Sequence, residues 1–123
     1  MTIMEALNRI DELKPNSYST SEKIRWLSTL DGLVKTRVID THEGGESVQF
    51  NGYTEDIDLD TVLLVEDLYA DVYIKWLETQ IDYANGEYAK YNNTAMAFNS
   101  AFTEYTNYYN RTHMPKGTKT KYF

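Results

Sequence analysis

The sequence predicts a mainly all-α fold, in which two short N-terminal helices precede a short β-hairpin or acidic loop and a long C-terminal helix or helical hairpin. Apolar residues recur at intervals of three and four along most of the chain, as on one face of an α-helix. Strand-like alternation is limited to one short stretch. The length of 123 residues fits one helical domain over 1–115, with the loop or hairpin inserted at about 40–60 and a flexible basic tail at 116–123.

The charged residues are unevenly distributed. The chain carries a net charge of −7, which argues against general nucleic-acid binding because phosphate contacts require a basic surface. Residues 38–74 contain ten acids and no Lys or Arg, so the rest of the chain carries a net charge of +3. Cysteine is absent, which excludes disulfides and thiolate metal sites. No apolar run approaches the roughly 18 residues of a membrane span, and the N-terminus lacks the apolar core of a secretory signal.

Two short helices are expected at the N-terminus. The first covers residues 3–13, and Pro15 ends it because proline lacks a backbone donor. The second covers about 19–38 and begins at Ser19, which with Glu22 forms the S-x-x-E pattern of a capping box. Each helix has one apolar face, formed by Ile3, Leu7, Ile10 and Leu13 in the first and by Ile24, Leu27, Leu30 or Asp31, and Val34 in the second.

The region from 40 to 60 is predicted to be irregular. Asn51-Gly52 is a type I′ turn signal between two short apolar stretches, so a short hairpin is expected over 48–54. The next stretch alternates acids with apolar residues, which predicts either a strand-like segment with its acids on one face or a solvated acidic loop. Its acids are Asp56, Asp58 and Asp60. A calcium-binding EF-hand is not expected, because the required glycine and final glutamate are missing.

The C-terminal half contains an a/d heptad seam. Its positions step by three and four from residue 70 to residue 109 without a slip. The aromatic members after residue 87 are Tyr88, Tyr91, Phe98, Phe102, Tyr105 and Tyr109. The part before residue 85 carries a second apolar face, formed by Tyr69, Trp76 and Tyr83. A helix that is apolar on two sides should pack against two neighbours and lie inside the domain.

Three asparagines follow the same heptad at the e position, next to the seam. They are Asn85, Asn92 and Asn99. From this position they could hydrogen-bond to a facing helix or to tyrosine hydroxyls and so set the register. They could equally lie on a half-exposed flank of the helix without such a role.

The seam could form one long helix or fold back on itself at Asn85-Gly86. The unbroken heptad favours one helix of about 45 residues, which would be about 70 Å long at 1.5 Å per residue. The small remainder of the chain could not cover so long a helix, so partner subunits would be implied. The alternative is a turn at Asn85-Gly86 that makes an antiparallel helical hairpin.

The sequence contains no pattern typical of catalysis or of cofactor binding. The two histidines, His42 and His113, stand far apart and show no metal-ligand spacing. There is no nucleophile motif and no phosphate-binding glycine loop. The paired carboxylates lie in a predicted loop without a nearby base. We therefore expect that the protein is not an enzyme and uses no cofactor or metal.

Several fragments together resemble a known family. They are LLVEDLYADVYIKWLETQIDYANGEYAKYNN, FN and YYNRTHMP, all within about residues 60–115. These fragments are similar to small proteins encoded in the head-morphogenesis block of tailed bacteriophages and of prophages of Gram-positive bacteria. Those proteins look like head–tail connector proteins, also called adaptor or head-completion proteins. The shared motif is a tyrosine-rich helical pattern without a catalytic signature.

This resemblance implies a structural virion protein, present in the host bacterial cytoplasm during assembly, that forms a homo-oligomeric ring under the portal protein. A tail-side stopper would dock beneath the ring, and DNA would pass through it without specific binding. The acidic segment and the basic tail would suit a head-to-tail ring, which needs two different complementary patches. The tail lysines are Lys116, Lys119 and Lys121. The alternative is a stand-alone interaction or regulatory protein that forms a coiled-coil dimer through the tyrosine heptad.

Overall fold

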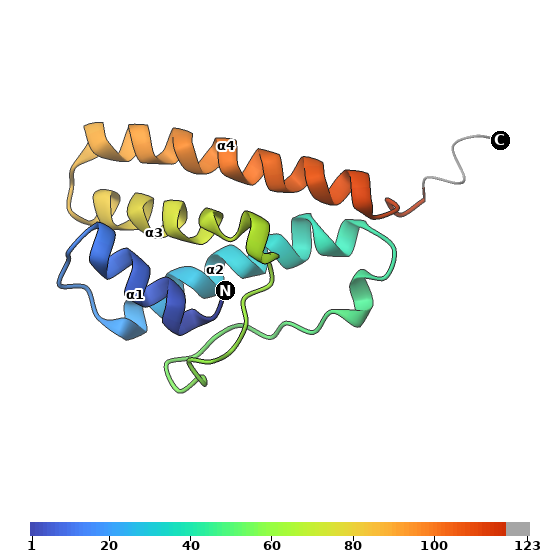
Figure 1. Cartoon of the computed structure of the whole chain (residues 1–123), viewed down its shortest axis with the longest axis horizontal. Coiled ribbons are helices and arrows are strands. Elements are labelled where there is room, and N and C mark those ends of the chain that lie inside the picture. The colour runs from blue at the N-terminus through green and yellow to red at the C-terminus, as the bar shows by residue number, and fades with distance from the viewer. Residues whose placement is uncertain (118–123) are drawn as a thin grey trace.

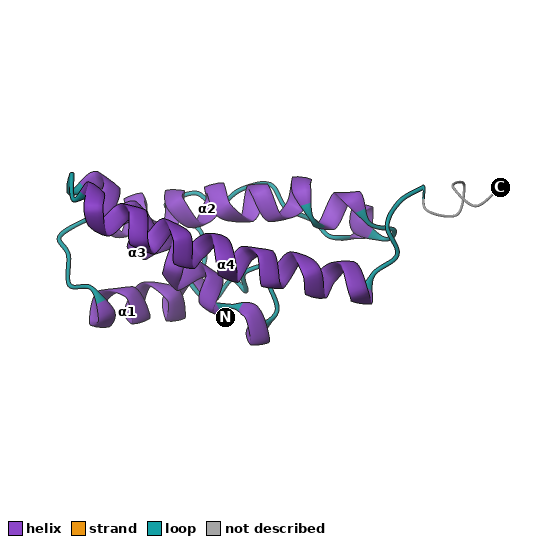
Figure 2. Cartoon of the chain, turned by 90° about the horizontal axis from the view of Figure 1, so that it is seen from above, coloured by secondary structure: helices purple, strands orange, loops and turns teal. Residues whose placement is uncertain are grey.

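Four α-helices build the fold in the computed structural model, which describes residues 1–117. α1 (Ile3–Leu13) and α2 (Thr20–Arg37) flank one side of α3 (Asp71–Ala84), and α4 (Tyr88–Thr112) lies along the other side of α3 (Figure 1) (Figure 2). Short 3-10 helices interrupt the long connection between α2 and α3, at Ile39–Thr41, Gly45–Ser47 and Asp67–Tyr69. The expected mainly helical fold is therefore confirmed.

One hydrophobic core lies between α1, α2 and α3. Each of these helices contributes the apolar face that its spacing predicts, except that Leu13, expected on the face of α1, is 55% exposed at the end of that helix. The central side chains are Ile3, Ile10, Leu27, Leu30, Val34, Ile74, Leu77 and Ile81, all of them almost fully buried. Burial of one such aliphatic side chain contributes about 1.5–3 kcal/mol, so this core is the main source of stability.

The start of α1 is held by its own cap and by the distant acidic loop. Thr2 and Glu5 form a capping box with two reciprocal hydrogen bonds of 2.9 and 3.1 Å. The backbone amide of Ile3 donates to the carbonyl oxygen of Thr61, and that of Met4 donates to the carbonyl oxygen of Leu59. The loop thus satisfies donors that a helix N-terminus would otherwise leave unpaired.

The predicted capping box of α2 is only half formed. The Ser19 hydroxyl accepts a hydrogen bond of 3.1 Å from the Glu22 amide, as expected. The Glu22 carboxylate, however, lies 3.5 Å from the Arg25 guanidinium and makes no reciprocal bond to Ser19 within residues 1–117. One side-chain cap is sufficient to define the start of this helix.

The predicted β-hairpin over 48–54 is wrong, since residues 1–117 contain no β-strand beyond two isolated bridges. Gly52 does adopt a positive φ of 88°, as its turn signal suggested. No backbone hydrogen bond crosses a hairpin in this stretch, however, and its bonds to distant residues go to α2, where the Tyr53 amide donates to the Ser28 hydroxyl at 2.9 Å. The segment is therefore an irregular strap that lies against α2.

The heptad region is a helical hairpin, so the favoured single long helix is wrong. α3 ends at Ala84, and Gly86 has a positive φ of 73°, which an α-helix cannot include. The amides of Asn85, Gly86 and Glu87 then donate to the last carbonyls of α3 and close the turn. α4 starts at Tyr88 and runs back along α3 (Figure 1).

α3 is packed on two sides, as its two apolar faces predict. Its heptad face contacts α1 and α2, and its aromatic face contacts α4. Two ring pairs join this aromatic face to α4: Trp76 lies 5.0 Å from Phe98, and Tyr83 lies 5.2 Å from Tyr91, measured between ring centroids. The second face of α3 is thus the partner that closes the tyrosine seam.

Candidate interaction surfaces

The predicted seam residues of α4 form a gradient of burial along the helix. Tyr105 and Tyr109, near its C-terminus, are buried. Tyr91, Phe98 and Phe102 are half-buried against α3. Tyr88, at the N-terminus, is 61% exposed. Most of the seam is therefore internal packing, and only its N-terminal end reaches the surface.

Tyrosines gather at the turn between α3 and α4, a region that we call the aromatic end (Tyr83, Tyr88 and Tyr91), in which Tyr83 and Tyr88 are exposed and Tyr91 is half-buried. Tyr83 is 58% exposed, and its ring lies 5.9 Å from that of Tyr88 and 5.2 Å from that of Tyr91. Clustered, accessible tyrosines are enriched in protein–protein interfaces, because the ring offers apolar area and the hydroxyl a hydrogen bond. The aromatic end is therefore a candidate contact surface.

The three asparagines of the e position all lie on the surface. Asn85 accepts a hydrogen bond of 2.6 Å from the Tyr18 hydroxyl, which ties the hairpin turn to the linker before α2. This tyrosine is not part of the seam. Asn92 and Asn99 are exposed and make no side-chain hydrogen bond within residues 1–117. Asn85 thus bonds to a tyrosine hydroxyl, which is one of the two expected kinds of partner, whereas Asn92 and Asn99 form no such bond within residues 1–117.

The acidic stretch consists of consecutive turns, so the strand-like alternative is wrong. Asp58 accepts a hydrogen bond of 2.9 Å from the Asp60 amide, and the Thr61 amide donates to the Asp58 carbonyl at 3.0 Å. Asp56, Asp58 and Asp60 are exposed, whereas the apolar residues between them, Ile57 and Leu59, are half-buried against the core. The alternation thus records which side chains face the core, although the backbone is not extended.

The ten acids of residues 38–74 lie on the long connection between α2 and α3 and on the start of α3. The loop around 55–60 lies on the side of the molecule away from α4 (Figure 1), whereas His42 and Tyr69 contact α4. Four of the ten acids have a positive partner: Asp40, Glu46, Asp67 and Asp71. The other six make no ion pair within residues 1–117: Glu43, Glu55, Asp56, Asp58, Asp60 and Glu66. The side chains of these six residues are exposed, so they form a candidate surface for repelling or binding charged partners.

The described part of the predicted basic tail lies beside the acidic segment of the same chain. The Lys116 amide donates to the Thr41 carbonyl at 3.0 Å, and the Lys116 ammonium lies 3.9 Å from Glu46. Lys119 and Lys121 lie outside the described residues. Lys116 thus lies near the acidic segment of its own subunit, whereas the ring hypothesis pairs the basic tail with the acidic segment of a neighbouring subunit.

A buried carboxylate lies at the centre of the core and was not predicted as a functional residue. Asp31 is fully buried on α2. It accepts hydrogen bonds from the Tyr53 and Tyr73 hydroxyls at 2.5 and 2.6 Å, and from the Leu64 amide at 3.1 Å. Burial raises the pKa of Asp31 above its usual value although these bonds oppose the rise. The only sequence signal was the position of this aspartate on the apolar face of α2.

The Asp31 network fastens the long loop to the helices. Tyr73 on α3 donates to Asp31 and accepts a hydrogen bond of 2.7 Å from the Val65 amide. Burial, reinforced by the carboxylate, raises the pKa of both tyrosines well above their usual range. Both hydroxyls therefore remain donors, and the network is a structural clamp and not an acid–base pair.

Folding brings the two histidines together near the C-terminus of α4. Their ring centroids lie 6.4 Å apart, and Tyr109 contacts both rings. His42 is buried, with Nδ1 2.6 Å from the Val38 carbonyl and Nε2 2.8 Å from the Asn110 side chain. Both of its ring nitrogens are engaged, so His42 has no nitrogen left for a metal. Residues 1–117 contain no group of three or more potential metal ligands.

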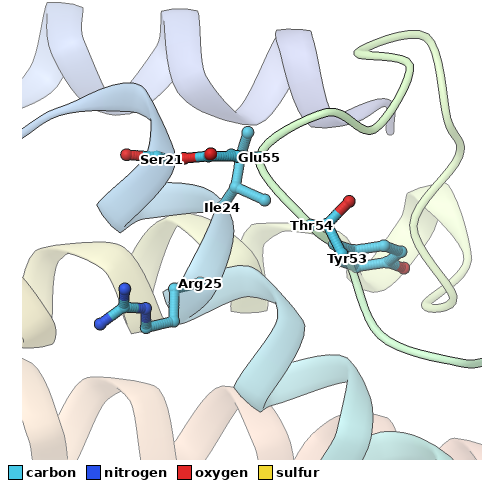
Figure 3. Close-up of a pocket in the computed structure, with 6 residues that line it drawn as sticks. All are labelled: Ser21, Ile24, Arg25, Tyr53, Thr54 and Glu55. Carbon is cyan, nitrogen blue, oxygen red and sulfur yellow. The ribbon is translucent and has the colours of Figure 1, made fainter.

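One partly open pocket of about 260 Å³ lies between α2 and the strap (Figure 3). Its walls are formed by Ser21, Ile24, Arg25, Tyr53, Thr54 and Glu55. Neither histidine lies in it, and the Tyr53 hydroxyl already donates to Asp31. The Glu55 carboxylate makes no hydrogen bond to the Ser21 or Thr54 hydroxyl within residues 1–117, so the pocket offers separate polar contacts to a ligand.

Comparisons with family models, with curated proteins and with solved structures found no match to this chain. Within the described residues, no helix is both long enough and apolar enough to cross a membrane. The surfaces described above are therefore the evidence from which a function can be proposed.

Proposed function

We propose that this chain is a structural subunit of the phage head–tail connector type, which assembles as a ring under a portal protein and lets DNA pass. One observation carries the proposal: the subunit has two dissimilar surfaces. One is the acidic loop over 55–60, which lies on the side of α3 away from α4, and the other is α4 with the aromatic end (Figure 1). A head-to-tail ring requires two different patches on each subunit, because the contact is heterologous.

The acidic segment suits a surface that DNA passes without binding. Six of its exposed acids have no positive partner within residues 1–117. Phosphates are repelled by such a surface, so it would disfavour the contacts that hold nucleic acid in place. In the proposed ring this segment faces the channel.

The alternative function, a regulatory coiled-coil dimer built on the tyrosine heptad, has less support. A coiled coil requires its a and d residues to be free for the partner helix. Tyr105 and Tyr109 are buried within the subunit, and Phe98 and Phe102 pack against α3 and one another. Only the N-terminal end of the seam remains accessible.

The direct test is assembly on the cognate portal protein. The purified chain is mixed with portal rings, and the products are examined by light scattering and electron microscopy. We expect one additional ring of density beneath the portal and a matching increase in mass. A chain that leaves the mass and shape of the portal unchanged at all ratios contradicts the proposal.

A second test concerns the passage of DNA. The triple variant Asp56→Asn, Asp58→Asn and Asp60→Asn removes three exposed charges while an amide oxygen at 58 can still accept the turn hydrogen bond. We expect normal ring assembly and slower DNA ejection from particles. The matched control is Glu12→Gln, which neutralises an exposed acid on α1. Unchanged ejection kinetics in the triple variant would contradict a channel-facing loop.

A third test concerns the tail. Deletion after Pro115 should weaken docking to the portal or to a neighbouring subunit, because it removes all three tail lysines. A full-length variant with Lys116, Lys119 and Lys121 changed to Gln separates the effect of charge from that of chain length. If the truncated chain assembles like the wild type, the tail has no part in docking.

A further inference from the structure

Within residues 1–117, no other element covers the outward face of α4. α4 packs chiefly on α3, and its opposite face is accessible along the whole helix (Figure 1). Exposed residues on this face step by 4, 3, 4, 3 and 4: Ala89, Asn93, Met96, Ser100, Thr103 and Asn107. This is a second heptad stripe, on the side opposite the tyrosine seam. Met96, at its centre, is 68% exposed.

Charge is almost absent from this face. No residue between 91 and 103 is charged, although the chain as a whole carries a net charge of −7. A helix face in contact with water is ordinarily rich in charged side chains. The small side chains of the stripe would also allow a second helix to approach closely. Two copies of this acidic protein could therefore meet here with less repulsion than through the acidic segment.

The two charges that bound the uncharged stretch are placed symmetrically. If Asn93, Ser100 and Asn107 are a positions, and Ala89, Met96 and Thr103 are d positions, the e positions are Lys90, Ala97 and Glu104. Lys90 and Glu104 each lie seven residues from Ala97. In an antiparallel helix pair, e positions of one helix face e positions of the other. A two-fold axis near Ala97 therefore sets Lys90 of each copy opposite Glu104 of the other.

We infer that the free protein forms a two-fold dimer in which the outward faces of two α4 helices pack antiparallel, with the register set by two Lys90–Glu104 ion pairs. The a positions then carry asparagine and serine opposite alanine, methionine and threonine. Polar a positions set register at a cost in stability, so the dimer is weak and exchangeable. A two-fold contact is isologous and cannot by itself propagate a ring, so the dimer belongs to the unassembled protein.

The side chains involved are free to make these contacts. Lys90 pairs with Glu87 within the subunit at 2.6 Å, but the Lys90 side chain is 68% exposed and that of Glu87 is 40% exposed. An exposed pair of this kind contributes little and can be exchanged. Glu104 is exposed and makes no ion pair within residues 1–117.

Sedimentation equilibrium of the wild type and two charge-reversal variants tests the dimer. Lys90→Glu and Glu104→Lys each replace both ion pairs with like charges, so each should raise the dissociation constant at least about tenfold at low salt. Glu104→Lys lowers the net charge of the chain from −7 to −5. If only the overall repulsion between the two acidic chains mattered, Glu104→Lys would tighten the dimer. The ion-pair arrangement predicts that it weakens the dimer.

Mixing the two variants provides the decisive result. In a dimer of one Lys90→Glu chain and one Glu104→Lys chain, both cross-pairs unite opposite charges, so the mixture should dimerise as the wild type does. Arg9→Glu, an exposed change on α1, is the matched control and should leave the dissociation constant unchanged. Circular dichroism verifies that every variant keeps its helices.

Each outcome bears on the dimer separately from the connector function. A wild type that remains monomeric at high concentration overturns the dimer, and so does a mixture that associates no better than each variant alone. The portal assay tests the ring independently. Dimerisation without any binding to the portal would support the α4 contact and contradict the connector proposal.

Discussion

At the scale of single residues, Asp31 is the side chain whose burial has the clearest consequence. It lies among apolar neighbours on α2, and its three donors come from the strap, the loop before α3, and α3 itself. Burial disfavours the ionised carboxylate, and hydrogen bonds favour it. The pKa of Asp31 is raised because burial is the larger of the two effects.

Replacing Asp31 with Asn should change how stability depends on pH. A raised pKa means that the folded state binds the proton more tightly than the unfolded chain does. The stability that Asp31 contributes is therefore fully present below the unfolded pKa and is lost as pH rises through the folded pKa. We expect the unfolding free energy of the wild type, minus that of Asp31→Asn, to increase as pH falls from about 7 to about 4. Urea denaturation at several pH values measures this difference, and a decrease on acidification contradicts it.

Tyr105 should gain from the loss of its hydroxyl group. Its side chain is fully buried, and its hydroxyl has no hydrogen-bond partner within residues 1–117. An unsatisfied buried polar group costs about 1–3 kcal/mol. Tyr105→Phe should therefore leave the unfolding free energy unchanged or raise it by up to about 1 kcal/mol.

Tyr73→Phe is the matched comparison for Tyr105→Phe. It removes a hydroxyl that is bonded to both Asp31 and the Val65 amide, so it should lower the unfolding free energy by about 1–3 kcal/mol. Chemical denaturation of both variants gives the two values. If the two substitutions have equal effects, the Tyr105 hydroxyl has a partner after all.

At the scale of elements, the turn at Asn85-Gly86 determines that the heptad region forms a hairpin of two helices and not one long helix. Three backbone amides close the turn onto the end of α3, and Asp82 ties the hairpin to α1. Its buried carboxylate lies 2.6 Å from the Lys14 ammonium and accepts a bond of 3.1 Å from the Thr94 hydroxyl. α1, α3 and α4 therefore share one anchoring point near the turn.

The sign of the effect of Gly86→Ala distinguishes the two arrangements. In the hairpin, Gly86 has a positive φ of 73°, and an alanine there is strained by about 1–2 kcal/mol although nothing lies within 4 Å of the added carbon. In one continuous helix the same change would stabilise by about 1 kcal/mol. We expect destabilisation, measured by urea denaturation. Stabilisation would contradict the hairpin.

At the scale of the whole molecule, charge is unevenly distributed along the chain. The segment 38–74 is acidic, whereas α4 is nearly uncharged. Repulsion within the acidic segment opposes compactness, and salt screens it over a distance of about 10 Å at 0.1 M.

The triple change of Asp56, Asp58 and Asp60 to Asn should therefore raise the denaturation midpoint modestly at low ionic strength. The three side chains are exposed, so no core packing is lost. The difference from the wild type should shrink at high salt because screening already removes the repulsion. Urea denaturation at two salt concentrations is the measurement. A midpoint below that of the wild type in both would show that the carboxylates stabilise the loop.

Much of the helical part of the fold was predictable from local pattern. The apolar face of α1 and α2, the start of α2 at Ser19 and the two-sided packing of α3 all follow from spacing and capping. The strap over 48–54 was not predictable in this way. Its Asn51-Gly52 signal is that of a hairpin, but its hydrogen bonds go to Ser28, a residue more than twenty positions away. Local turn chemistry cannot anticipate a distant acceptor.

The candidate surfaces likewise include features that local pattern predicted and features that it could not predict. The exposure of the acidic loop followed from its alternation with Ile57 and Leu59, and this held although the backbone forms turns. The Asp31 clamp and the contact between the two histidine rings depend on segments far apart in the chain, so they could not be predicted from local spacing.

The sequence by itself determined which residues of 70–109 share a face, because that depends only on the period of the helix. What only the tertiary structure decided is which surface that face meets. A heptad continues through Asn85-Gly86 whether the helix bends or not, since the repeat records spacing and not direction. The chain folds back because Gly86 can adopt a positive φ and because α4 then buries part of the aromatic face of α3. Folding thereby buries the tyrosine seam and leaves the opposite face of α4 exposed.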